Sequence, residues 1–142
     1  MSGPVYKAPS LYVSITIGGE IEHSLVTAAM NVAPSHTAIR GRSRWPGGPP
    51  AKSTYWLWRT EVVEAYDAGP SFQSALRLLE ESAASLSRLR QQYDLSIMLR
   101  VNVTIEPRYE TAPAMYWTND QLDRLARLGV NLECDVTLLA AE

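Results

Sequence analysis

The residues with the clearest chemical capacity are two histidines, His23 and His36, and a single cysteine, Cys134. Neither histidine has a cysteine or second histidine at zinc-ligand spacing, so a metal site would need carboxylates from elsewhere in the chain. A nucleophilic serine is often found in a Gly-x-Ser-x-Gly turn, and the chain has no such pattern. The sequence therefore predicts no catalytic residue, no metal and no cofactor, and we expect a protein that is not an enzyme.

A Gly18-Gly19 pair stands before a helical pattern, as glycines do in turns that bind phosphate at a helix N-terminus. The Gly-x-Gly-x-x-Gly and Walker patterns are both missing, and Glu20 and Glu22 would repel a phosphate. We interpret the pair as an ordinary turn.

The distribution of charge is more informative. Residues 23–60 contain five basic and no acidic side chains, whereas the rest of the chain has eight basic against fifteen acidic, a formal charge of −7. Arg40, Arg42 and Arg44 lead to Trp45, which joins guanidinium donors to a ring suited to stacking. This pattern is typical of a site for an acidic partner, and a solvated loop without function fits it too. Three arginines in an acidic chain favour a protein or a small anion over nucleic acid.

The hydrophobic pattern predicts the elements that position these residues. Alternating apolar side chains predict strands over residues 11–17, 37–40, 52–60, 95–105 and 130–138. Apolar residues three and four apart predict helices over residues 21–31, 72–93 and 118–128. The last helix has a capping box from Thr118 to Gln121, a buried stripe of Leu122, Leu125 and Leu128, and a stop at Gly129. Residues 40–52, rich in glycine and proline, form a loop that we call the basic loop.

The order β-α-β-β-α-β-α-β predicts an α+β fold, with a ferredoxin-like β-α-β-β-α-β core, one added helix and strand, and a largely antiparallel sheet. Helices on one sheet face would leave the other open, lined by Tyr12, Ser14, Thr16, Met98, Arg100, Asn102, Thr104, Glu133 and Asp135. Arg100 is placed to pair with Glu133 or Asp135. Either Trp56 and Trp58 or Tyr55 and Leu57 face the same way, because neighbours on a strand point oppositely.

Composition agrees with one globular domain over residues 1–142, with a flexible N-terminus at residues 1–10. No apolar run reaches the length of a membrane span, and no hydrophobic segment near the start suggests a secretory signal. A lone cysteine suits a reducing compartment, so we expect a cytoplasmic protein with Cys134 buried in the last strand.

The order of several segments resembles a known pattern. These are a first strand ending in Gly-Gly, Val32-Ala33-Pro34-Ser35, the Arg40-Gly41 turn, the aromatic strand Ser53–Trp58, a long helix and Leu125–Val130. It is similar to the bacterial domain-of-unknown-function family forty-two seventy-nine, from about residue 11 to residue 138. The resemblance implies a small uncharacterised α+β domain and supplies no functional residues. Small bacterial domains of this kind are often encoded beside toxins, which suggests an immunity role by analogy alone.

Three functional hypotheses remain. The first is a non-enzymatic module that binds a protein, an immunity or regulatory protein for example, through Arg40, Arg42, Arg44, Trp45 and the open sheet face. The second is a small-ligand binder or enzyme with a pocket between the sheet and the basic loop, lined by Trp56, Trp58 and Arg100. The third is a structural homodimer.

Overall fold

One mixed sheet carries the whole fold of the computed structural model, which describes residues 7–140. The strands are β1 (Ser10–Gly18), β2 (His36–Ala38), β3 (Tyr55–Arg59), β4 (Val63–Glu64), β5 (Ser96–Ile105) and β6 (Asn131–Leu138). The helices are α1 (His23–Met30), α2 (Gly69–Glu81), α3 (Ala83–Gln92) and α4 (Asn119–Leu128). The predicted α+β class is therefore confirmed.

The sheet order is β2-β3-β1-β5-β6, and β4 pairs with the start of β1. The pairs β1–β3, β1–β5 and β2–β3 are antiparallel, and only β5 and β6 run parallel, which requires the crossover through α4. The sheet is largely antiparallel, as predicted.

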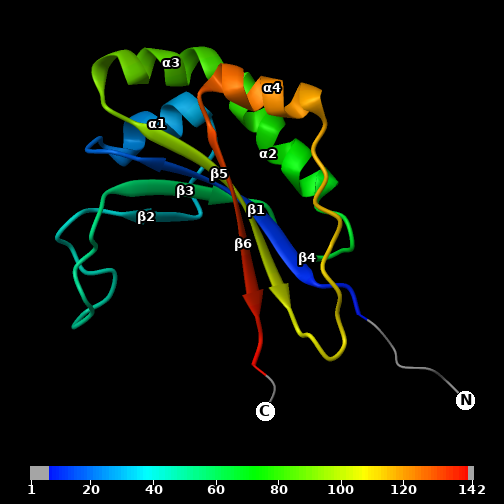
Figure 1. Cartoon of the computed structure of the whole chain (residues 1–142). Helices are drawn as coiled ribbons and strands as arrows, with labels where there is room; N and C mark the ends of the chain where they lie inside the picture. The colour runs from blue at the N-terminus through cyan, green and yellow to red at the C-terminus, as the bar shows by residue number, and fades with distance from the viewer. Residues whose placement is uncertain (1–6, 141–142) are drawn as a thin grey trace, which may run out of the picture.

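All four helices cover the same face of the sheet (Figure 1). Alternate residues of β1 from Leu11 to Ile17 point toward them, and the register sets these opposite the alternate residues of β5 from Ile97 to Val103. Phe72, Leu76 and Leu79 of α2 close the core from above and are fully buried. Each such side chain contributes about 1.5–3 kcal/mol through burial.

The helix predicted over residues 72–93 is in fact two helices. Ser82 lies between α2 and α3 with ψ at 0°, and its buried Oγ donates to the Met30 carbonyl at the end of α1, 3.5 Å away. The backbone bonds from Ser82 N to Leu78 O and from Leu86 N to Ser82 O are kept, so the chain changes direction at Ser82 without a loop. The bend turns α3 across α1 while Leu86 still reaches the core.

The predicted ends of α4 are confirmed. Thr118 Oγ1 accepts from the Gln121 amide at 3.1 Å, Gln121 Oε1 accepts from the Thr118 amide at 3.0 Å, and Gly129 is left-handed with φ 66°. Leu125 is buried as predicted, but Leu122 is 43% exposed, so the buried stripe is shorter than the sequence indicated.

The prediction of a buried Cys134 is wrong. β6 is the last strand of the sheet, its residues after Leu132 are exposed, and the Cys134 thiol is among them. Alternation in the sequence shows which residues share a face, and it does not show whether a helix covers that face.

The flexible N-terminus was predicted over residues 1–10, and residues 1–6 of it lie outside the described residues. In the described part, the Lys7 amide donates to the Tyr109 carbonyl at 2.6 Å and Ser10 opens β1. Within residues 7–140, no helix is both long enough and apolar enough to cross a bilayer.

Candidate functional site

The basic loop joins β2 to β3 and extends from the sheet on the side away from the helices (Figure 1). It is closed on itself by backbone hydrogen bonds: the Gly41 amide donates to Ala51 O and the Ala51 amide donates to Arg42 O, each at 2.9 Å. At its tip the Gly48 amide donates to Trp45 O at 3.0 Å. A loop with this many internal bonds presents its side chains in a defined arrangement.

Trp45 and the three arginines are the exposed groups of this loop. Trp45 is 57% exposed, and its indole packs against the Gly48 backbone so closely that an added Cβ there would lie 2.6 Å from the ring. Arg40, Arg42 and Arg44 are exposed, and none of the three forms an ion pair with a carboxylate among residues 7–140. No carboxylate within the described chain therefore neutralises these three guanidinium groups.

His36 anchors the loop to the sheet, a role that the sequence did not indicate. Arg44 Nη2 donates to His36 Nδ1 at 3.2 Å, and the ring nitrogen must accept because a guanidinium has only donors. His36 pairs with Leu57, which lies opposite Thr16, so the contact is made on the open face of the sheet. The sequence predicted a strand over residues 37–40, which left His36 outside it, whereas β2 begins at His36.

Trp56 and Trp58 face the helices, and of the two predicted arrangements of β3 the structure has the one in which Tyr55 and Leu57 face the open side. Trp56 pairs with Ile17, is 0% exposed, and donates from Nε1 to Thr27 Oγ1 at 3.1 Å. Trp58 packs against the same core. Neither side chain lies on the face that carries Arg100, so these three residues do not line a common pocket.

Four polar side chains of the open face pair with one another across the strands. Arg100 Nη2 donates to Glu133 Oε2 at 3.2 Å, so of the two predicted cross-strand partners, Glu133 and Asp135, the structure has Glu133. Asn102 Nδ2 donates to Ser14 Oγ at 3.1 Å. Arg100 Nε is the one buried side-chain nitrogen or oxygen of this face without a hydrogen-bond partner in the described chain.

On the same face, the Arg59 guanidinium lies over the Tyr12 ring, 5.3 Å from its centroid. The contact is a cation–π interaction that occupies both side chains. The two arginines of the open face, Arg59 and Arg100, are therefore engaged within the chain, and the face adjoins the basic loop at His36.

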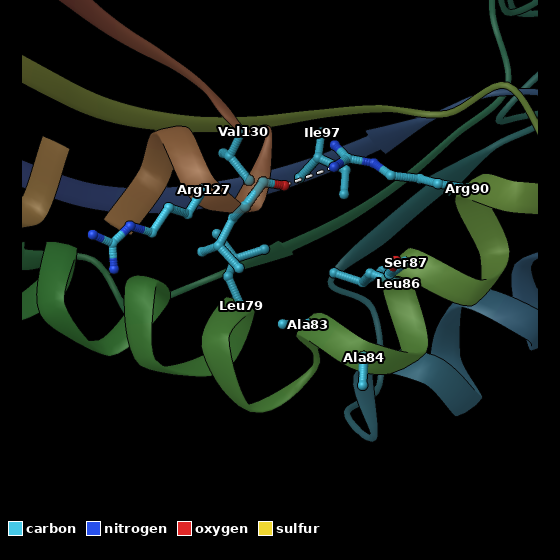
Figure 2. A pocket seen from close by; sticks show the side chains of 10 residues that line it. Leu79, Ala83, Ala84, Leu86, Ser87, Arg90, Ile97, Arg127 and Val130 are labelled. Carbon is cyan, nitrogen blue, oxygen red and sulfur yellow. Dashed lines mark hydrogen bonds between the residues drawn. The ribbon is translucent and has the colours of Figure 1, made fainter. Parts of the chain in front are cut away.

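A hollow of about 360 Å³ lies between α2, α3 and the turn from α4 to β6 (Figure 2). Its walls are mostly apolar, and Arg90 spans one end of it, donating from Nη1 to Leu128 O at 2.6 Å and from Nη2 to Gly129 O at 2.7 Å. These bonds satisfy the free carbonyls at the end of α4, where a cation is also favoured by the helix dipole. Arg90 thus holds the fold together at this point.

The nucleophilic and metal-ligating residues lie apart. Among residues 7–140, no three His, Cys, Asp or Glu side chains gather where they could hold a metal ion. Although Cys134 is an exposed residue, its neighbours partly desolvate the thiol, and this, together with the charge of Glu133, raises its pKa and disfavours the reactive thiolate.

Comparison with known proteins gives one match. A family model described as a domain of unknown function, DUF4279, matches residues 9–139. No curated protein and no solved structure matches the chain.

Proposed function

Because the chain belongs to the family DUF4279, whose function is unknown, we propose from its own surface that it is a non-enzymatic module that binds an acidic protein. The basic loop is the contact surface, and the observation that carries the proposal is its ordered display of Trp45 beside three arginines without carboxylate partners. Exposed tryptophan and arginine are the side chains most often found to dominate binding energy at protein interfaces.

Charge supports an acidic partner. The loop lies in the longest stretch of the chain without an acidic side chain, residues 23–60, while the rest of the chain carries a formal charge of −7. Such an asymmetry steers an acidic surface toward the loop and keeps it from the rest of the molecule. Nucleic acid is disfavoured, since three arginines neutralise few phosphates and the overall charge is −2.

The open face extends this surface at His36, where Leu57 lies opposite on β3. We propose that the protein acts as immunity and regulatory proteins do, by binding a partner protein through this surface. The proposal includes two finer assignments. The antiparallel order β2-β3-β1-β5 with intervening helices supports a ferredoxin-like core, and the lone cysteine supports a cytoplasmic address.

The test compares capture from an extract of the native cells by three tagged proteins. They are the wild type, a loop variant with Arg42, Arg44 and Trp45 changed to alanine, and a control variant with Arg88, Arg127 and Tyr116 changed to alanine. The control likewise removes two arginines and one aromatic side chain from exposed positions elsewhere. Circular dichroism first establishes that all three fold.

We expect one companion to be recovered in equal amount with the wild type and the control and to be lost with the loop variant. Its recovery should fall as salt rises, because exposed charges are screened beyond about 8 Å at physiological ionic strength. Equal recovery by all three proteins would remove the loop from the interface, and recovery of the domain alone would refute a stable protein partner.

A further inference from the structure

The outer edge of β6 is the one long edge of the sheet that stays bare. β6 pairs with β5 on one side, and among residues 7–140 no strand pairs with the other. Val136 and Leu138, which point to the helical side, are 46% and 64% exposed because no helix reaches over them. Natural proteins usually protect such edges, because free backbone groups beside apolar side chains invite another strand.

The free backbone groups of β6 belong to alternate residues. The Leu139 amide donates inward to Ile105 O at 2.9 Å. Because N–H and C=O directions alternate along a strand, the backbone groups of Cys134, Val136 and Leu138 point outward. The outward groups and the exposed apolar side chains therefore come from the same residues.

We propose that β6 of a second copy of this chain adds to this edge in an antiparallel pair, with the two-fold axis at Val136. In this register Val136 meets Val136 of the copy, and Cys134 meets Leu138 in both directions. Each of these is a pair in which both residues point their backbone groups at the partner, so the ladder is completed without a break. The apolar side chains form one continuous stripe on the helical side.

Charge disfavours the two registers whose axis lies nearer the start of β6. An axis at Cys134 would set Glu133 opposite Asp135, and an axis at Asp135 would set that carboxylate opposite its own copy, each of which destabilises a strand pair. With the axis at Val136, Asp135 lies opposite Thr137, whose hydroxyl can donate to it. Glu133 is already paired with Arg100 within each copy.

The dimer would be a single sheet running through both copies. β2 lies at the opposite end of the sheet order from β6, so the two basic loops would stand at the two far ends. A dimer with two separate loops gains avidity for a partner that carries more than one acidic site. The pairing itself does not depend on the loop's binding anything.

The test measures the mass of the tagless protein in solution by sedimentation over a range of concentrations. We expect the wild type to approach twice the 15.8 kDa chain mass with a dissociation constant in the micromolar range. Strand pairing alone buries less surface than the roughly 1,600 Å² of a standard stable interface. Val136→Lys, which puts a charge into the apolar stripe, should be monomeric throughout. Val62→Lys, at a 52% exposed position outside β6, should dimerise as the wild type does.

A cross-link tests the register separately. In a Cys134→Ser background, Val136→Cys should form a disulfide-linked dimer on mild oxidation, because the axis brings the two thiols face to face. The wild type should not cross-link, since its Cys134 meets Leu138. A monomeric wild type at all concentrations, or a dimeric Val136→Lys, would overturn the proposal. A wild type that cross-links readily through Cys134 would overturn the register.

Discussion

Replacing Trp56 with phenylalanine should destabilise the fold by about 2 kcal/mol. The indole is 0% exposed and its Nε1 donates to Thr27 Oγ1 at 3.1 Å. Loss of that hydrogen bond costs about 0.5–1.5 kcal/mol. The void left by the smaller ring adds on the order of 1 kcal/mol, because the core closes only partly around it. With a urea dependence of about 2 kcal/mol per molar for a chain of this size, the unfolding midpoint should fall by about 1 M.

Trp45→Ala is the matched control, since it removes a larger side chain from a position that is 57% exposed on the basic loop. Surface substitutions usually change stability by no more than about 0.5 kcal/mol, so its urea midpoint should move by less than about 0.3 M. The assay should follow far-UV circular dichroism, because the chain has four tryptophans and each variant changes the fluorescence. An unchanged midpoint for Trp56→Phe, or an equal loss for Trp45→Ala, would refute the assignment of Trp56 to the core and Trp45 to the surface.

Two further changes test the helical layer. The Arg124 guanidinium lowers the pKa of Glu80, so the pair stabilises the fold above the ordinary carboxyl pKa of about 4.3 and stops doing so as pH falls through the lowered value. Glu80→Gln should therefore lower the free energy of unfolding by less than about 1 kcal/mol at pH 7 and leave it unchanged near pH 2. Urea titrations at both pH values measure this. An equal loss of stability at both would contradict the ion pair as its cause. Gly129→Ala should lower the free energy of unfolding by about 1–2 kcal/mol, because φ is 66° and the new Cβ would lie 2.7 Å from Arg90 Nη1. A thermal unfolding midpoint equal to that of the wild type would count against both the backbone strain and the close contact.

Elements that depend on neighbouring residues were predictable from the sequence. The capping box at Thr118 and the stop at Gly129 each arise from side chains or backbone within one turn of the helix end. The alternation of β1 and β5 likewise predicted which residues share a face, and the register brings them together. The same reasoning placed Arg100 beside Glu133 or Asp135, and the register of β5 and β6 decides for Glu133.

Features that depend on distant residues were not predictable in this way. Ser82, at the bend, donates to the Met30 carbonyl, which is 52 residues away in the chain. The apolar residues keep their helical spacing through this one-residue break, so the sequence pattern did not show it. Alternation in Tyr55–Arg59 divides the side chains into two sets, and only the position of α1 and Thr27 decides that Trp56 belongs inside. The exposure of Cys134 follows from its strand being the last in the sheet, a property of the whole topology.

The two edges of the sheet differ in what they offer a partner. β2 has three residues and leads into a loop with Pro46, Pro49 and Pro50, which lack N–H groups and cannot extend a ladder, so recognition there must use side chains. β6 has eight residues without proline, so it can pair through its backbone. The loop variant should therefore lose the acidic partner and keep the dimer mass. Val136→Lys should keep the acidic partner and have the mass of the monomer. If either change removed both properties, one interface would have to contain both edges, and neither assignment would stand.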